Sequence, residues 1–489
     1  MVEQNLDLAS KLKPDERAVA EFRLQAISPD DGKYGKSADR LREYLSADAE
    51  WRTCAYIQKV LLETRLEFSN VAAVQSFRII ELDKALRQFS PLNAALLEER
   101  VTRHDQLAVL EELGRFITPE TKALLHPGTT SYDILDTARA YLLQGAWRDV
   151  MRHEVSKTIR RVCELSEEYM SVLQVGRTHL QDTSPVLFGG VLASYASRLA
   201  ERTKKCDGYF SDLRGKISGI VGTGASIDMV IGAGMSIEFE KRVLEKLGLK
   251  PDYTATQITQ KERLADLGHG IVTLMHVLGD FANDMRFLYS SAVGEVSDRE
   301  SEERLGGSSA DAGKNNPIHW ENIAGKVAVV ESGMRVLYEM IHSDLQRDLR
   351  GSVQARYQPG MMIAETYESF NRVNKALRTL SVNQERISQN LKYLINNPTE
   401  AMTAILRGAG YVDPVYGVSH DFVKAMAIKA KKQGKDLLDI CVNTSDHFIS
   451  ALKSLSNEKQ AILRGILELY TGSAHERAQM NISYARGVI

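Results

Sequence analysis

The sequence has few of the features of a secreted, metal-binding or membrane-spanning protein. Only 4 of its 489 residues are cysteines, and these are scattered, without a Cys-x-x-Cys or Cys/His spacing. Neither a disulfide framework nor a zinc site is therefore expected. No run of about 18 apolar residues occurs, and the N-terminal segment has no apolar core of signal-peptide type. We predict a cytoplasmic protein that is neither secreted nor embedded in a membrane.

Charge of one sign and proline are also scarce. The chain carries 62 Lys plus Arg against 64 Asp plus Glu, a net charge of −2, so composition gives no reason to expect nucleic acid or a membrane surface as a partner. It has only 11 prolines, and segments in which β-branched residues alternate with polar ones are rare, so helix is favoured almost everywhere. The length suggests about three domains.

Two stretches carry apolar residues at alternating intervals of three and four. The first comprises Leu264, Leu267, Ile271, Leu274, Leu278, Phe281, Met285 and Leu288, and the second Ile323, Val327, Val330, Met334, Leu337 and Ile341. A repeat of 3.5 residues sustained over this length predicts long helices that supercoil against neighbouring helices. Further long helices are predicted from 134 to about 169, from about 186 to 214, and from 366 to 391.

These helices predict an all-α protein with a central bundle at 133–380. A smaller helical domain precedes it at 1–132, with turn signals at 28–36 (SPDDGKYGK) and 126–129 (HPGT). A third domain of shorter helices follows at 381–489, with turns at 396–398, 408–410 and 414–417.

The stretch GGSSADAGKNNP, residues 306–317, is a small-residue loop between two predicted helices. A nucleotide-binding P-loop is excluded, because five residues separate Gly307 from Gly313 where that motif has four, and no buried strand precedes them. Asn316 and Pro317 suit the N-cap and first turn of the next helix.

Lys314 would then lie beside the positive end of a helix, a location suited to a carboxylate or a developing anion. Ser308 and Ser309 lie on a soft segment that can cover a bound substrate as a lid. A surface connector between two helices is the alternative interpretation.

Three other stretches carry candidate site residues. VGRTHLQDTSP places Arg177, Thr178, His179 and Gln181 in a turn between two long helices; EERVTRHDQL brings Arg103, His104 and Asp105 together; HPGTTSYDILDTA has Thr130 and Ser131 just before a long helix. An acidic neighbour can fix the tautomer of a histidine, and hydroxyls with free backbone amides can bind a carboxylate. A structural histidine, a solvated helix face and ordinary N-capping are the respective alternatives.

Together these stretches resemble the fumarase/aspartase superfamily, and within it the adenylosuccinate lyase family. GSSADAGKNNP resembles the superfamily signature GSSxMPxKxNP, and HPGTTSYDILDTA and GRTHLQDTSPVLFGG resemble its two other blocks. Stretches closer to the adenylosuccinate lyases are SPDDGKYG, TRHD, GKISGIVGTGASID, TQITQKERLAD, QRDLRGSVQAR and YTGSA. The resemblance covers nearly the whole chain.

The resemblance implies an all-α subunit of three domains that assembles into a homotetramer with active sites shared between subunits. It also implies a C–N bond cleavage that releases fumarate from a succinylated purine nucleotide, with no metal or other cofactor. Such a reaction requires a base, an acid on the opposite face, and donors for the charge that develops on a carboxylate.

The resemblance also implies residue roles. Ser308 is the expected base, activated by Lys314 and the adjacent helix N-terminus, and His179 is the expected acid. His104 would orient or balance charge near the phosphate. The expected binding residues are Thr130, Ser131, Lys314 and Asn316 for the succinyl carboxylates, Lys33, Tyr34, Arg347, Ser352 and Arg356 for phosphate and ribose, Gln257 near the base, and Arg103, Asp105, Thr178 and Ser309 around them.

Two departures from the family pattern bear on substrate. Lys33 replaces the usual arginine, which keeps the charge without the bidentate fork and predicts weaker phosphate binding. Asp311 and Ala312 stand where the signature has Met-Pro, adding a negative charge to the loop. A related lyase acting on another succinylated amine, such as argininosuccinate, and a non-catalytic descendant are therefore alternatives.

Overall fold

The computed structural model describes residues 12–68, 72–298, 310–311 and 313–489. The chain forms two compact units, each built from three separate segments. Unit 1 comprises residues 1–155, 202–276 and 325–371, and unit 2 comprises residues 156–201, 277–324 and 372–489. The division into three consecutive domains stays a prediction.

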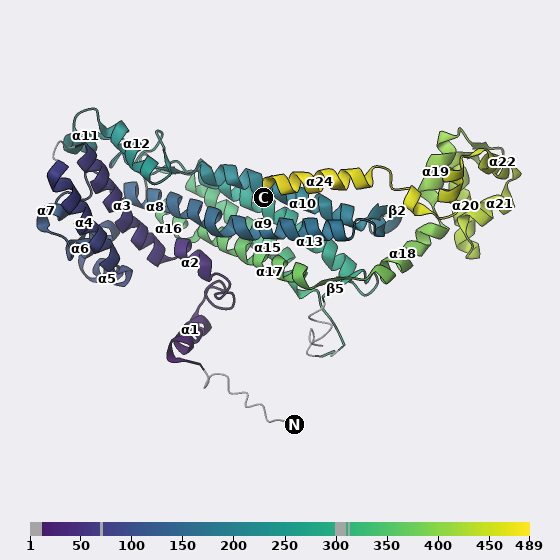
Figure 1. Ribbon diagram of the computed structural model, residues 1–489, viewed down its shortest axis with the longest axis horizontal. Helices are drawn as coiled ribbons and strands as arrows, with labels where there is room; N and C mark the ends of the chain where they lie inside the picture. Colours follow the sequence, from purple (N-terminus) through teal and green to yellow (C-terminus); the bar gives the residue numbers. More distant parts are fainter. Residues whose placement is uncertain (1–11, 69–71, 299–309, 312) are drawn as a thin grey trace, which may run out of the picture. The chain divides into compact units, whose positions relative to one another are not determined.

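Five long helices, labelled in Figure 1, lie side by side. Each has residues in both units. They are α9 (Arg152–Glu168), α10 (Phe188–Ser211), α13 (Glu262–Tyr289), α15 (Ile318–Met340) and α17 (Gly360–Thr379). The 3.5-residue repeat is buried along α13, where Leu267, Leu274 and Leu278 are 0% exposed. In α15, Ile323 and Leu337 are likewise fully buried, so both predicted seams are confirmed as helices, although Ile341 lies just beyond the end of α15.

Further helices complete unit 1. They are α1 (Pro14–Gln25), α2 (Asp39–Leu45), α3 (Ala47–Glu67), α4 (Ala72–Gln88), α5 (Pro91–Leu97), α6 (Asp105–Gly114), α7 (Pro119–Lys122), α8 (Ser131–Gly145), α11 (Ala225–Ile231), α12 (Ser236–Lys246) and α16 (Arg350–Tyr357), with π-helical turns η2 (Glu98–Thr102) and η3 (Ala146–Met151). Helices α3 and α8 pack against each other, and Leu61 of α3 and Ile134 of α8 are both fully buried.

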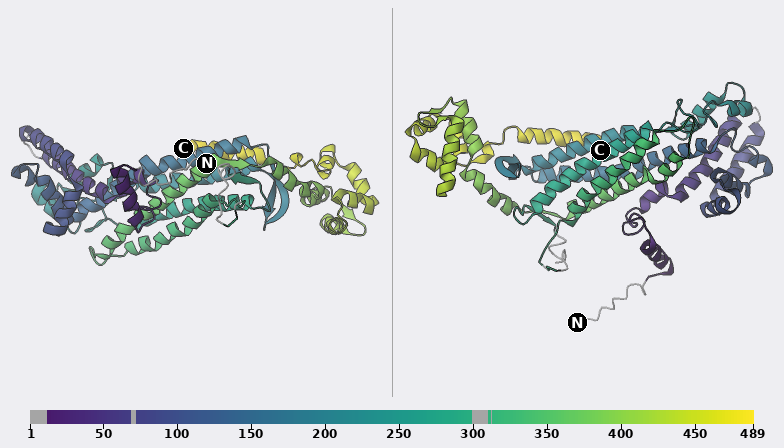
Figure 2. Two further views of the ribbon diagram at one scale, coloured as in Figure 1. Left: turned by 90° about the horizontal axis from the view of Figure 1, so that it is seen from below. Right: turned by 180° about the vertical axis from the view of Figure 1, so that it is seen from behind.

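Unit 2 contains most of the later helices. They are α18 (Gln384–Asn396), α19 (Thr399–Gly408), α20 (Ser419–Gln433), α21 (Leu437–Thr444), α22 (Asp446–Ser454), α23 (Asn457–Leu463), η4 (Leu467–Leu469) and α24 (Ala474–Val488). Helices α19 to α22 form one cluster in every view (Figures 1 and 2). Its core includes Met402, Phe422 and Phe448, and the last two rings stack with centroids 5.5 Å apart.

The described strands form four two-stranded sheets, all short. The antiparallel pairs are β1 (Leu173–Thr178) with β2 (Gln181–Leu187), β5 (Val296–Asp298) with β6 (Leu380–Val382), and β7 (Val412–Asp413) with β8 (Gly417–Val418); β3 (Arg214–Gly215) pairs with β4 (Lys250–Pro251) in parallel. The all-α prediction is therefore confirmed.

Two predicted helices differ from the structure. The helix expected at 134–169 is interrupted by the π-helical turn η3 between α8 and α9. The single helix expected at 366–391 is wrong, because α17 ends at Thr379, residues 380–382 pair with β5, and Asn383 then caps α18 by accepting a bond from the Arg386 N–H at 2.9 Å. Among the described residues, no helix is both long and apolar enough to cross a membrane.

Candidate active site

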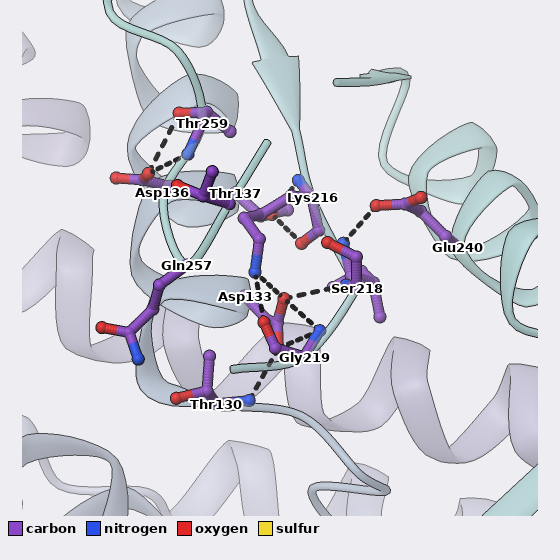
Figure 3. Close-up of polar contacts among 12 residues, drawn as sticks. Thr130, Asp133, Asp136, Thr137, Lys216, Ser218, Gly219, Glu240, Gln257 and Thr259 are labelled. Carbon is purple, nitrogen blue, oxygen red and sulfur yellow. Dashed lines mark hydrogen bonds and ion pairs between the residues drawn. The ribbon is translucent and has the colours of Figure 1, made fainter. Parts of the chain in front are cut away.

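A buried carboxylate in the first turn of α8, that of Asp133, connects two segments of unit 1 (Figure 3). Asp133 accepts hydrogen bonds from the backbone N–H groups of Thr130 at 2.6 Å, Ser218 at 2.9 Å and Gly219 at 3.2 Å. It also forms an ion pair with Lys216, and both side chains are 0% exposed. Asp133 therefore joins the N-terminus of α8 to the segment 216–219.

The same contacts explain the N-terminus of α8. Thr130 is the N-cap and forms a reciprocal capping box with Asp133, so ordinary capping, the alternative weighed for this residue, does occur. Gly128 just before it has φ +66°, and a Cβ there would lie 2.6 Å from the Ser226 carbonyl oxygen. Only glycine fits this close approach of two backbones. Ser131 follows and lines the adjacent cavity.

A second buried carboxylate, one helical turn further along α8, holds the neighbouring loop. Asp136 accepts bonds from the Thr259 N–H at 2.8 Å and from the Lys261 ammonium at 2.7 Å. Burial alone would raise the pKa of Asp136, but the Lys261 charge and hydrogen bond hold that pKa below its ordinary value. The carboxylate is therefore ionised and paired.

A cavity of about 780 Å³ opens beside these groups within unit 1. Seven of the expected substrate-binding residues line it: Arg103, His104, Asp105, Ser131, Arg347, Ser352 and Arg356. They come from segments far apart in the chain, and the volume lies in the range that suits a drug-sized or cofactor-sized ligand.

The electrostatics of this cavity favour an anion. Arg139 in its wall is neutralised by Glu50, with Nε 2.9 Å from the carboxylate. Arg103, Arg347 and Arg356 form no ion pair with a carboxylate anywhere in the described part of the chain. Three uncompensated guanidinium groups around one cavity suit a ligand with phosphate or carboxylate groups.

Arg347 is held on two sides. Its guanidinium carbon lies 3.8 Å from the centroid of the Tyr132 ring, and its Nη1 donates to the side-chain oxygen of Gln257 at 2.9 Å. Gln257, expected near the base of the nucleotide, is not among the residues that line the cavity, and its place near the base stays a prediction.

Ser352 and Arg356 lie four residues apart on α16 and share one face of that helix. Glu98, also in the cavity wall, was missed by the sequence reasoning because nothing around it repeats or marks a turn. Burial raises the pKa of Glu98, while the nearby Arg356 charge acts in the opposite direction.

His104 lies at the junction of η2 and α6. It is the N-cap of α6, and its Nδ1 is 3.3 Å from the Asp105 carboxylate and 3.5 Å from the Leu107 N–H. The preceding residue, Arg103, has φ +53°, which is unusual for a residue with a side chain. Local strain of this kind is often found at functional sites.

Lys33 and Tyr34 lie elsewhere in unit 1 and do not line this cavity. The Tyr34 ring is 4.5 Å from the Lys326 ammonium, and Lys326 forms an ion pair with Glu365. The structure thus places the SPDDGKYG motif against α15 and α17, apart from the arginine cluster.

The remaining candidates belong to unit 2. His179 and Leu180 form the two-residue turn between β1 and β2, in which Thr178 pairs with Gln181. Both turn residues have positive φ, +55° and +60°, as a type I′ hairpin turn requires, yet neither is glycine or asparagine. The expected turn is confirmed, while the hairpin itself was not predicted.

The base of this hairpin is fixed by a carboxylate that the sequence reasoning also missed. Glu295, 0% exposed, forms an ion pair with Arg177 at 2.7 Å and accepts bonds from Gln174 at 2.6 Å and Asn390 at 2.8 Å. Arg177 also contacts Asp182 at 3.1 Å. Arg177 is therefore a structural residue of the hairpin.

Lys314 is exposed and Asn316 partly buried, just before the N-terminus of α15. The helix begins at Ile318, one residue later than expected, and the Pro317 carbonyl accepts from the Glu321 N–H at 3.0 Å. Asp311 accepts a bond from the Gly313 N–H at 3.1 Å, and its carbonyl accepts from the Lys314 N–H at 3.1 Å. Ser308, Ser309 and Ala312 lie outside the described residues.

Comparison with known proteins assigns this arrangement to a family. A family model described as lyase matches residues 52–331, more than half of the chain. The chain belongs to this lyase family. The superfamily predicted from the combined motifs is thereby confirmed.

Relatives within the lyase family agree over most of the chain. A protein of Pyrococcus abyssi (strain GE5 / Orsay) named adenylosuccinate lyase is 28% identical, over 94% of this chain and 98% of the relative. A protein of Bacillus subtilis (strain 168) with the same name is 32% identical, over 61% of this chain and 67% of the relative.

Solved structures support the fold. A fumarate lyase from Mesorhizobium sp. BNC1 has a TM-score of 0.74 at 20% identity and covers 91% of this chain and 97% of its own. A 3-carboxy-cis,cis-muconate lactonizing enzyme from Pseudomonas putida has a TM-score of 0.76 at 18% identity, with 92% and 98% covered. At these identities the likeness concerns the fold alone.

Proposed function

We propose that this protein cleaves adenylosuccinate into AMP and fumarate, and that it acts in the same way on the succinylated aminoimidazole carboxamide ribotide of purine biosynthesis. The observation that carries the proposal is the cavity of unit 1, in which Arg103, Arg347 and Arg356 have no carboxylate partner among the residues that the structure describes. The relatives named adenylosuccinate lyase that match over most of the chain support the same activity.

In this proposal Arg347, Arg356 and Ser352 bind the phosphate and ribose of the nucleotide. Guanidinium groups suit a phosphate because their planar fork donates two parallel hydrogen bonds. Thr130 and Ser131 would hold a succinyl carboxylate with Lys314 and Asn316. His104 would balance charge near the phosphate, and Lys33 and Tyr34 would contribute to nucleotide binding from their own segment.

The reaction requires one proton to leave carbon and another to reach nitrogen. Ser308, activated by Lys314, would take the proton from the carbon beside a succinyl carboxylate. The electrons of that C–H bond form the C=C bond of fumarate, the C–N bond breaks, and His179 protonates the departing nitrogen. Donors around the carboxylate stabilise the carbanion-like charge in the transition state.

The candidate residues are divided between the two units. The arginine cluster belongs to unit 1, whereas His179, Lys314 and Asn316 belong to unit 2. From the resemblance to the superfamily, we propose a homotetramer with active sites shared between subunits. Light scattering of the purified protein tests the assembly, and a monomer with full activity would rule out shared sites.

The arginine cluster is tested with the double variant Arg347→Ala, Arg356→Ala. Two charge-assisted contacts of about 1.5 to 3 kcal/mol each are lost, so kcat/KM for adenylosuccinate is expected to fall at least about 100-fold. Arg52→Ala is the matched control, because Arg52 is half-exposed and does not line the cavity; its ion pair with Asp48 at 2.7 Å is local, and it also donates to the Phe89 carbonyl at 3.5 Å. Unchanged nucleotide turnover by the double variant would refute the nucleotide assignment.

The acid and base are tested separately. His179→Gln and Ser308→Ala are each expected to lower kcat by about 100-fold or more, because general acid–base catalysis contributes 10² to 10⁴. AMP binding by both variants, measured by calorimetry, is expected to stay intact. Near-wild-type turnover by either variant would remove that residue from its role.

A further inference from the structure

Tyr132 occupies an unusual place beside the arginine cluster. It follows Ser131 in the first turn of α8, is 5% exposed, and lies with its ring centroid 3.8 Å from the guanidinium carbon of Arg347. Its hydroxyl is buried and has no hydrogen-bond partner within the described residues. The ring therefore has a defined contact, whereas the hydroxyl has none.

The backbone around Arg347 is fixed by a neighbouring loop. The Gln346 carbonyl accepts a bond from the Thr256 hydroxyl at 2.7 Å and another from the Gln257 N–H at 3.3 Å. The Gln257 side chain then accepts from Arg347 Nη1. The guanidinium is thus held by an aromatic face on one side and an amide oxygen at one edge, which leaves its other N–H groups for a ligand.

We propose that Tyr132 is a positioning residue that preorganises Arg347 for the phosphate of the nucleotide, and that its aromatic ring, not its hydroxyl, does so. This inference rests on the proposed function. A free arginine side chain has many rotamers, and an arginine already held in its binding orientation loses less freedom when a ligand arrives.

Tyr132 itself is rigid enough for this role. The capping box of Thr130 and Asp133 brackets it, and Asp133 is tied to Lys216, Ser218 and Gly219. The buried Asp133 network thus fixes the backbone that carries Tyr132, and the Tyr132 ring in turn supports Arg347 inside unit 1.

The test compares Tyr132→Phe, Tyr132→Leu, Arg347→Ala and the double variant Tyr132→Leu, Arg347→Ala. Tyr132→Phe keeps the ring and is expected to leave KM for adenylosuccinate within about 2-fold of the wild type. Tyr132→Leu removes the aromatic face and is expected to raise KM roughly 3- to 30-fold, the range of a cation–π contact, with kcat changed little. In the Arg347→Ala background, Tyr132→Leu is expected to add nothing.

Calorimetry with AMP and with adenosine separates positioning from simple destabilisation. Tyr132→Leu should weaken AMP binding by the same factor as it raises KM, and should leave adenosine binding unchanged because adenosine has no phosphate. Melting temperatures of all variants show whether the fold is kept.

Several outcomes would overturn the inference. An effect of Tyr132→Phe equal to that of Tyr132→Leu would assign the role to the hydroxyl. Multiplicative effects in the double variant, or equal weakening of AMP and adenosine, would show that Tyr132 does not act through Arg347. If Arg347→Ala raises KM and Tyr132→Leu does not, only this inference fails. If the wild-type protein binds no AMP, the proposed function fails and this inference with it.

Discussion

The buried Asp133–Lys216 pair yields the most demanding stability prediction. Both side chains are fully buried, and the carboxylate also accepts three backbone N–H groups, from Thr130, Ser218 and Gly219. In Asp133→Asn, the Lys216 ammonium loses its counter-charge. The new amide NH₂ group is a donor, so at least one N–H or ammonium donor that bonded to the carboxylate loses its acceptor.

Breaking a buried ion pair from one side costs about 3 to 5 kcal/mol, because the remaining charge stays in a poorly solvated site. For a unit of a few hundred residues this corresponds to a fall of roughly 5 to 10 °C in the midpoint of thermal unfolding. Scanning calorimetry and differential scanning fluorimetry measure that midpoint directly.

Two further variants sharpen the comparison. Glu21→Gln removes the carboxylate of the exposed Arg17–Glu21 pair, with side chains 61% and 58% exposed, and is expected to cost about 0 to 1 kcal/mol. The double variant Asp133→Asn, Lys216→Met is expected to recover part of the loss, because the unpaired ammonium is gone. A midpoint for Asp133→Asn equal to that of Glu21→Gln would refute the reasoning.

Three other outcomes follow from the structure. Burial raises the pKa of Glu240 from 4.5 to about 7, so the stability that its protonated form contributes is fully present below pH 4.5 and is lost as the pH rises through about 7. The stability of Glu240→Gln relative to the wild type should therefore rise by up to roughly 3 kcal/mol between pH 4.5 and 8. A difference in melting temperature that does not change with pH would contradict this. Leu180→Gly, which relieves a positive φ in an exposed hairpin turn, should slow hydrogen exchange in β1 and β2 by an amount equivalent to roughly 1 kcal/mol, and faster exchange would be the opposite result. Phe422→Ala, at a site with 0% exposure in the core of α19 to α23, should cost about 3 to 5 kcal/mol in urea unfolding, and a loss below about 1 kcal/mol would show that the core repacks.

Periodicity made much of the fold predictable. The two seams have a repeat that only long packed helices satisfy, and α13 and α15 are confirmed over nearly their whole predicted lengths. The role of Glu295 and the strand β5 could not be predicted from periodicity. Residues 380–382 read as a continuation of α17, but their pairing with β5 and the Asn383 cap break the helix, and pairing between distant segments leaves no local signal.

Those candidate site residues that lie within family motifs could be predicted from the sequence. Seven expected residues line one cavity because the family motifs encode positions that meet in space. Glu98 and Tyr132 were missed, since a single glutamate on a helical turn and a tyrosine after Ser131 look like ordinary residues in the sequence. Tyr132 is singled out only by its contact with Arg347, and Glu98 only by its place in the cavity wall near the Arg356 charge; both depend on tertiary packing.

The measurement that tests the central claim most directly is the release of fumarate and AMP from adenylosuccinate by the purified wild-type protein. The double variant Asp311→Met, Ala312→Pro should be assayed in parallel, and argininosuccinate should be offered to the wild-type protein as an alternative substrate. The account predicts stoichiometric fumarate and AMP from the wild-type protein and no cleavage of argininosuccinate. Cleavage of argininosuccinate alone, or no fumarate from adenylosuccinate with either protein, would contradict it.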